Sequence, residues 1–193
     1  MIDDLQRRAD EAEESGHLEL ALELWKERSR GDSAAIFLLK YGGLASKMGR
    51  WDEAESAFSD AILLCPPTAS PLFRALCRTN MGTLWLRRTD KDQTESMSTA
   101  KAWFIESLAV ERKAPTLSLL GAACARLDDA DGARAAFEEA IALDPEYEEA
   151  FFNLALIEEE RTLRRLANCF SEPFNSIPTE GPHTECWVEF ARS

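Results

Sequence analysis

The sequence lacks an apolar run long enough to cross a bilayer, so we expect no membrane-spanning helix and no membrane partner. Its first residues are acidic and polar, so we also expect no signal peptide. Basic residues are in the minority, with 22 Lys and Arg against 35 Asp and Glu and a net charge of −13 at pH 7. Non-specific binding to nucleic acid requires a basic face, so we expect no nucleic-acid partner.

Residues typical of catalytic sites are also scarce. The sequence has only two histidines, His17 and His183, and neither belongs to a recognisable acid–base or nucleophile motif. It has no glycine-rich phosphate loop, dinucleotide fingerprint or zinc-protease helix. His183, Cys186 and Cys169 fall short of a structural zinc pattern in number and spacing. We therefore predict that the protein is not an enzyme and requires no cofactor or metal.

The cysteines do not form a disulfide pattern. Five are present, an odd number, and they are scattered along the chain. A disulfide framework normally uses an even number at regular spacing. The hydrophobic content of 45% and the charged content of 30% are near ordinary values for soluble proteins. These features predict a soluble, cytoplasmic protein with reduced thiols.

An internal repeat is the main positive signal. At two places a glycine is followed after 12, 16, 19 and 24 residues by an alanine, a phenylalanine, an alanine and a proline. The two sets are Gly42, Ala54, Phe58, Ala61, Pro66 and Gly121, Ala133, Phe137, Ala140, Pro145. The glycine and alanines let two helices approach closely, and the aromatic ring fills the space between them. A turn is expected at Gly49, which suits a left-handed helix end.

This pattern, in residues 35–68 and 114–147, resembles the tetratricopeptide-repeat family. The resemblance implies an all-α fold, a right-handed solenoid of helical hairpins about 34 residues long. A third copy in 75–113 has Gly82, Ala100, Phe104 and Ser107 at a stretched spacing, which we assign to an insertion at 89–99 forming a loop or extended helix ends. A second insertion covers 66–74.

A more divergent copy opens the chain in 2–34, with a turn at Gly16 and with Ala21 and Trp25 as the alanine and aromatic pair. Terminal helices follow in 148–171, which completes a solenoid over 1–171.

At the C-terminal end, Asp144 is expected to cap a helix that begins at Pro145. A separate helix over 161–167 is expected to close the solenoid with a polar outer face. Residues 172–193 form a proline-containing tail, in which Trp187 and Phe190 either dock back on the solenoid, mediate self-association or belong to a free terminus.

In this family the first helices of successive repeats line a concave face that commonly receives an extended peptide. The resemblance therefore implies that the partner is a protein or an extended peptide. The residues expected to contact it are Leu39, Lys47, Leu76, Thr79, Asn80, Thr83, Arg87, Ser118, Ala122, Arg126 and Asn153.

Two features of this set are informative. Asn80 and Asn153 can bond both donors and acceptors of a peptide backbone, although amides on a helix surface are equally satisfied by water or neighbours. Lys47, Arg87 and Arg126 each stand five residues after a close-packing glycine and can form a basic row that binds acidic groups. Alternatively, each cation simply complements the end of its helix.

Two functions remain open. The first is an adaptor or co-chaperone-like scaffold that binds a peptide in the groove, and the second is a structural subunit that uses its convex face or tail. Family members that clamp a chaperone's terminal carboxylate use lysine, asparagine and arginine at defined groove positions. Gln6, Asp10, Leu39 and Gly43 stand at several of those positions here, which disfavours chaperone tails as ligands.

Overall fold

The computed structural model describes residues 4–30 and 34–171, with side chains through residue 167. That part of the chain contains nine α-helices and no strand, and none of the helices is long and apolar enough to cross a membrane. The predicted tail, with Trp187 and Phe190, lies outside the described residues. The helices are α1 (Asp4–Glu14), α2 (Leu18–Arg28), α3 (Ala34–Lys47), α4 (Trp51–Leu64), α5 (Pro71–Arg87), α6 (Gln93–Val110), α7 (Ala114–Arg126), α8 (Ala130–Leu143) and α9 (Glu148–Ser171).

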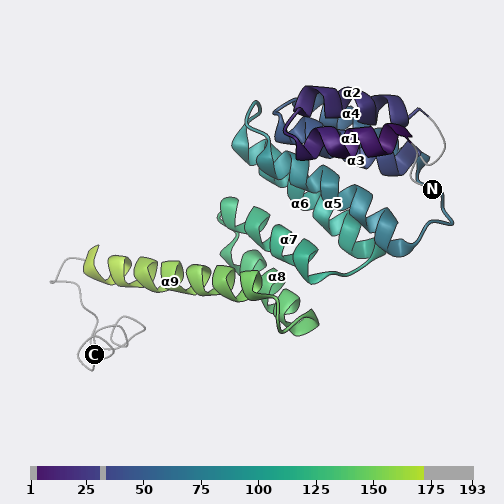
Figure 1. Ribbon diagram of the computed structural model, residues 1–193. Coiled ribbons are helices and arrows are strands. Elements are labelled where there is room, and N and C mark those ends of the chain that lie inside the picture. Colours follow the sequence, from purple (N-terminus) through teal and green to yellow (C-terminus); the bar gives the residue numbers. More distant parts are fainter. Residues whose placement is uncertain (1–3, 31–33, 172–193) are drawn as a thin grey trace.

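Consecutive helices pair into hairpins, α1 with α2, α3 with α4, α5 with α6 and α7 with α8 (Figure 1). The hairpins stack so that α3 contacts α5, α5 contacts α7 and α7 contacts α9. Among the described helices, α2, α4, α6 and α8 make no contact with one another. The first helix of each hairpin therefore faces one side of the solenoid and the second helix faces the other, which confirms the predicted all-α, right-handed hairpin solenoid.

Each hairpin is closed by a glycine placed against an aromatic ring. A Cβ added to the glycine would lie 2.5 to 2.7 Å from a ring carbon, closer than side-chain atoms approach in real structures. The pairs are Gly42 with Phe58, Gly82 with Phe104 and Gly121 with Phe137. All three rings are buried. The predicted glycine–phenylalanine packing is confirmed, including the copy whose spacing is stretched.

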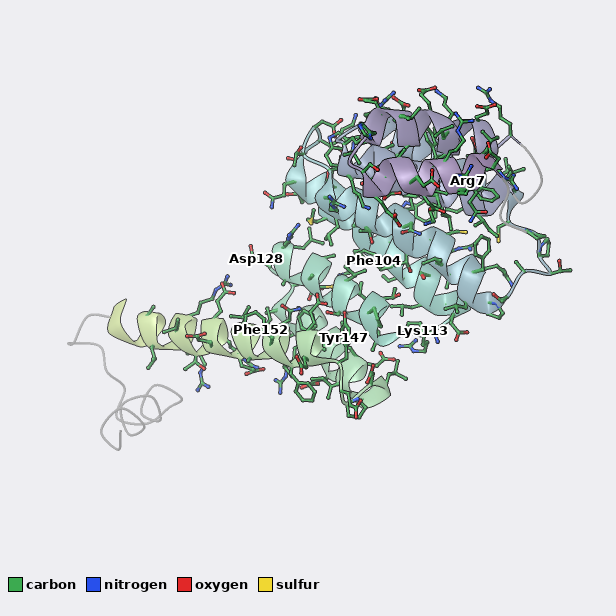
Figure 2. All side chains as sticks on the ribbon, in the orientation of Figure 1. Arg7, Phe104, Lys113, Asp128, Tyr147 and Phe152 are labelled. Atoms are coloured by element: carbon green, nitrogen blue, oxygen red, sulfur yellow. The ribbon has the colours of Figure 1, made fainter. Side chains whose placement is uncertain are left out.

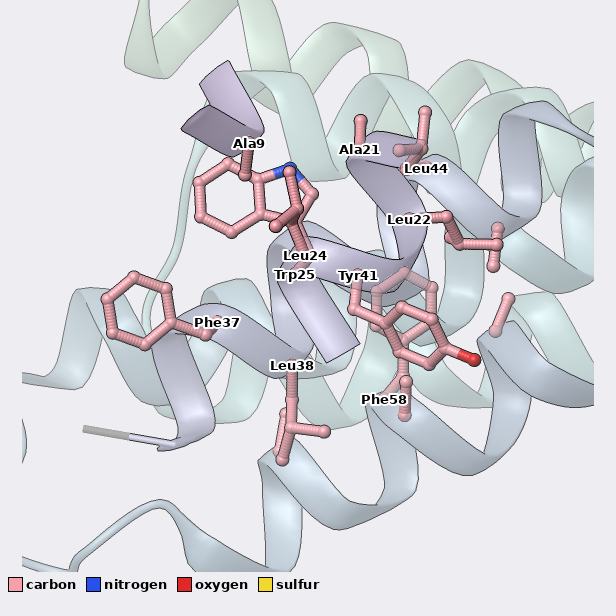
Figure 3. Packing of buried hydrophobic residues seen from close by; sticks show 14 of the residues in the cluster. Ala9, Ala21, Leu22, Leu24, Trp25, Phe37, Leu38, Tyr41, Leu44 and Phe58 are labelled. Atoms are coloured by element: carbon pink, nitrogen blue, oxygen red, sulfur yellow. The ribbon is translucent and has the colours of Figure 1, made fainter. Parts of the chain in front are cut away.

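The divergent first hairpin also has a glycine turn and a buried aromatic residue, but with different side chains from the other hairpins. Gly16 forms the turn with a φ of +76°, and Ala21 and Trp25 are completely buried. The Trp25 ring stacks on Phe37 at 6.0 Å between ring centres, which joins the first hairpin to the second (Figure 3). The predicted turn at Gly49 is also confirmed by a φ of +74°.

The two insertions adopt different structures. Most of the first is a short loop that ends where the Ser70 hydroxyl accepts a hydrogen bond from the amide of Phe73, which starts α5. Most of the second is helical, because Asp92 caps α6 by accepting from the amide of Glu95 at 3.0 Å, and the helix begins at Gln93. The insertion therefore extends α6.

Arg88 holds this extended hairpin against its neighbour. Its side chain is 1% exposed and donates hydrogen bonds to Asp52 and Glu55 on α4 and to Asp90 in the following loop, at 2.5 to 2.7 Å. Its guanidinium also lies 5.0 Å from the centre of the Trp85 ring. A buried arginine is stable only when its charge is paired in this way.

Two expectations for the C-terminal end are wrong. The helix begins at Glu148 rather than Pro145, because the Asp144 carboxylate accepts from the amide of Glu146, two residues on, and forms a turn instead of a cap. Residues 161–167 are not a separate helix, since α9 runs unbroken to Ser171. No glycine or proline interrupts the sequence between the two expected helices, so nothing ends the first one.

Candidate functional site

Exposed and half-buried side chains recur every three or four residues along α3, α5 and α7, which places them on one face of each helix. The opposite faces pack on α4, α6 and α8. We call the resulting surface the first-helix face. Its predicted members are Leu39, Lys47, Leu76, Thr79, Asn80, Thr83, Arg87, Ala122 and Arg126, all of which retain exposed surface.

The other two predicted site residues differ from this group. Ser118 is 2% exposed, so its side chain offers almost no surface to a ligand. Asn153 is half-buried on α9, next to the α7 part of the face. The first-helix face therefore extends onto α9, but with Ser118 behind it rather than on it.

The hydroxyl groups on α5 are largely used within the protein. Thr79 Oγ1 shares hydrogen bonds with Ser107 Oγ at 2.8 Å and with Thr116 Oγ1 at 3.3 Å, and Ser107 donates to the Ala75 carbonyl. Thr83 donates to the Thr79 carbonyl at 2.9 Å. These contacts join α5 to α6 and α7 and leave the threonine methyl groups as the part best suited to contact a ligand.

The three predicted cations are not equivalent. Lys47 Nζ lies 3.1 Å from the Glu13 carboxylate, so its charge is already paired. Arg126 donates to the carbonyl of Leu86 at 3.1 Å, and Leu86 is the residue before Arg87. Within the described ranges, neither Arg87 nor Arg126 forms an ion pair. The Arg126 side chain thus reaches the C-terminal end of α5, where Arg87 is the residue after Leu86, and neither arginine has a carboxylate partner among the described residues.

This arrangement can bind an anion. Guanidinium groups form short, paired hydrogen bonds to carboxylates, and each arginine presents five donors. In a protein with a net charge of −13, most of the surface repels acidic groups, so these two cations form a local exception. The half-buried Asn80 lies two helical turns away on the same helix and supplies both a donor and an acceptor.

Two hollows lie elsewhere on the solenoid. One of about 230 Å³ lies between the α7–α8 turn and α9, where Arg134 lies 3.3 Å from Glu158 and Arg164 lies 3.1 Å from Asp128. A second of about 360 Å³ is lined mainly by apolar residues of α6, α7 and α8, including Ile105 and Leu108. Neither contains a set of groups typical of catalysis.

Sequence reasoning missed three apolar side chains on the first helices. Ile36 is 50% exposed on α3, and Phe152 and Leu156 are 65% and 46% exposed on α9. Ile36 stands six residues before Gly42, as Leu76 does before Gly82, so the repeat offset that identified Leu76 also points to it. The two α9 residues stand at the offsets of Thr79 and Thr83.

The comparisons with known proteins agree with this architecture. The family model described as tetratricopeptide repeat matches residues 114–147, which form the hairpin of α7 and α8. A comparison with curated proteins gave no match. Among solved structures, one titled "Crystal structure of MamA" is similar with a TM-score of 0.66 and 18% identity, over 100% of this chain and 99% of that one.

Two further structures contain bound peptides. The first tetratricopeptide-repeat domain of Spaghetti (RPAP3) bound to an HSP90 peptide has a TM-score of 0.54 at 22% identity, over 65% of this chain and 91% of that one. NprR in complex with its cognate peptide NprX has a TM-score of 0.53 at 16% identity, over 97% of this chain and 58% of that one. Together with the three glycine–phenylalanine pairs, this similarity shows that the chain has the fold of tetratricopeptide-repeat proteins, and residues 114–147 match the tetratricopeptide repeat itself.

Proposed function

We propose that this protein is a binding module, not an enzyme, that holds an extended segment of another protein along the first-helix face. The observation that carries the proposal is the hydrogen bond from Arg126 on α7 to the Leu86 carbonyl on α5, next to Arg87. Neither arginine has a carboxylate partner in the described residues. An acidic group of the bound segment supplies the missing partner.

The other residues of the first-helix face have complementary roles in this proposal. Asn80, and Asn153 beyond it, bond the peptide backbone through their amides. Leu39, Leu76 and Ala122 contact apolar side chains, and Lys47 exchanges Glu13 for an acidic group of the ligand. Ser118 supports the wall from behind. The structures of RPAP3 and NprR, which share this fold, each contain a bound peptide, and this supports a peptide as the ligand.

We also propose that the protein acts in the cytoplasm. Cys77 and Cys124 are buried as free thiols, and burial raises the pKa of Cys77 to about 12, which keeps that thiol protonated and unreactive.

One observation favours the alternative function, a structural subunit that binds through the second helices. This is the apolar hollow of about 360 Å³ between α6 and α8.

The two functions are separated by charge reversal on the first-helix face. We expect the Arg87→Glu, Arg126→Glu variant to lose a partner that the wild type captures reproducibly from native extract. The matched control, Arg8→Glu with Arg30→Glu, makes the same change in net charge at exposed positions in and just after the first hairpin, outside α3, α5, α7 and α9, and should keep the partner. If both variants keep it, the peptide-binding proposal fails and the α6–α8 hollow becomes the surface to test.

A further inference from the structure

Helix α9 carries an apolar stripe that no described part of the chain covers. Phe152, Leu156 and Leu163 are 65%, 46% and 58% exposed, and at 100° per residue they lie within about 40° of one another around the helix. The residues that attach α9 to α7 and α8 are Ala150, Leu154 and Ile157, on the other half of the helix. Figure 2 shows Phe152 on α9 and the length of this helix that extends from the solenoid body.

The spacing of the stripe is typical of a surface that packs on another helix. With Glu159 and Leu166 included, its residues follow one another at intervals of four, three, four and three. This alternation keeps side chains on the seam between two helices. We call Phe152, Leu156, Glu159, Leu163 and Leu166 the α9 seam.

The seam continues the first-helix face along α9, since Phe152 and Leu156 stand at the offsets of Thr79 and Thr83. Each preceding first helix is covered by the second helix of its own hairpin. Helix α9 occupies the place of a fifth first helix, and Ala155 stands at the position of the close-packing glycines. It continues to Ser171 without turning back, so within the described residues it has no second helix. Phe151 stands at the offset of the buried Leu38 and Leu117, and it is 47% exposed because no second helix covers it within the described residues.

The negative charge around the seam determines which kind of ligand can bind to it. Glu148, Glu149, Glu159 and Glu160 lie on the same half of α9 as the seam. A second copy of α9, aligned on Glu159 in either direction, brings Glu159 against its own equivalent, which is unfavourable. Residues 172–193 of this chain contain four glutamates and one arginine, so they repeat the same sign of charge. The occupant that complements the seam is basic.

We propose that the α9 seam docks an amphipathic helix of a partner protein, with apolar residues toward Phe152, Leu156 and Leu163 and with basic residues on its flanks. The partner's cations face the glutamates of α9. This inference concerns a helical ligand at the α9 end of the first-helix face, and it does not depend on Arg87 or Arg126.

The test uses a labelled 21-residue helical peptide with leucine at heptad positions a and d and lysine at e and g, measured by fluorescence anisotropy with the full chain. We expect the lysine peptide to bind about tenfold more tightly than the same peptide with glutamate at e and g. Phe152→Asp with Leu156→Asp should weaken binding about tenfold or more. The control, Leu63→Asp with Leu64→Asp, alters leucines that are 80% and 54% exposed on α4 and should not weaken it.

Glu159→Lys should reduce the preference for the lysine peptide. The proposal is overturned if the seam and control variants bind alike, or if the two peptides bind equally. It is also overturned if Trp187→Asp with Phe190→Asp raises the affinity about tenfold, because the chain's own C-terminal residues then occupy the seam. A dimer in sedimentation that Phe152→Asp dissociates would assign the seam to a second copy instead.

Discussion

Two adjacent glycines on α3 have different surroundings. A Cβ on Gly42 would lie 2.7 Å from Cε1 of Phe58 and 3.2 Å from the Cβ of Ala57, whereas a Cβ on Gly43 would meet no atom within 4 Å. Both residues lie inside a helix, where alanine is intrinsically preferred to glycine. The pair therefore separates the helix preference of a residue from the packing requirement of its position.

We expect Gly42→Ala to lower the free energy of unfolding by about 1–2 kcal/mol. The destabilisation from overpacking against Phe58 is larger than the stabilisation from the higher helix propensity of alanine. Gly43→Ala should raise it by about 0.5–1 kcal/mol through propensity alone. Urea unfolding followed by circular dichroism measures both. Equal effects of the two substitutions would mean that the Gly42–Phe58 contact does not limit the approach of α3 to α4.

The turn between α7 and α8 contains a residue in an unfavourable conformation. Asp128 has a φ of +57° at the position that Gly49 occupies, with +74°, between α3 and α4. We expect Asp128→Gly to stabilise the protein by about 0.5–1 kcal/mol, since glycine adopts this φ without steric cost. The loss of the exposed ion pair with Arg164 reduces this gain only slightly.

Gly49→Ala provides the opposite change at the equivalent turn. It should destabilise by about 1 kcal/mol, because alanine does not readily adopt a positive φ. Thermal unfolding of the two variants gives the comparison. A destabilising effect of Asp128→Gly would show that the ion pair with Arg164, rather than the backbone, dominates at this position.

At the scale of helices, Asp129 joins two hairpins. Its carboxylate caps α8 by accepting from the Gly132 amide at 3.0 Å and accepts from Lys101 on α6 at 2.7 Å. The hydrogen bond from Lys101, followed by the Gly132 amide, lowers the pKa of Asp129 below its usual value. The charged form of this residue therefore stabilises the folded state.

The stabilisation by Asp129 should therefore decrease as the pH is lowered. A carboxyl group with a lowered folded pKa contributes fully above its unfolded pKa, about 4, and this contribution is lost as the pH falls through the folded pKa. Asp129→Asn keeps a capping side chain but removes the charge. We expect it to destabilise by about 0.5–1 kcal/mol at pH 7, a difference that disappears by about pH 2.

Urea titrations at the two pH values measure this difference. Asp131→Asn is the control, because it removes an exposed carboxylate from the same helix end without breaking an ion pair in the described residues. A pH-independent effect of Asp129→Asn would contradict the assignment.

The helices that sequence reasoning located correctly are those with short-range signals. Glycine turns and glycine–aromatic spacing depend on residues less than one hairpin apart, so Gly49 and the three ring contacts were predictable. The Arg88 cluster was not, because Asp52 and Glu55 are more than 30 residues away and nothing in the sequence links them to a buried arginine. The start of α9 was wrong because Asp144 makes a local turn that competes with capping.

In the candidate site, too, features that depend on nearby residues were predictable and features that depend on contacts between hairpins were not. The repeat offset placed Asn80, Arg87 and Arg126 on exposed helix faces, as the structure has them. It could not show that Ser118 is buried or that Lys47 is paired with Glu13, since both outcomes depend on neighbouring hairpins. Offsets identify a face, and contacts between repeats decide which of its side chains remain available.

For the molecule as a whole, each hairpin contacts only its neighbours along the solenoid. Stability in such an array is approximately a sum of hairpin terms and interface terms, so the ends can open without the centre. Trp25 belongs to the first hairpin and Phe104 to the third, and both are completely buried. Truncation of the side chain to alanine should therefore destabilise fewer helices at Trp25 than at Phe104.

We expect Trp25→Ala to remove amide protection from α1 and α2 while α5 to α8 keep theirs, because the other interfaces remain intact. Phe104→Ala, which costs about 3–5 kcal/mol, should reduce protection in all hairpins, since it weakens the packing that joins the two halves. Hydrogen exchange followed by mass spectrometry resolves the individual helices. A uniform loss of protection in Trp25→Ala would mean that the solenoid unfolds as one cooperative unit, so that a ligand on any helix would stabilise all of them.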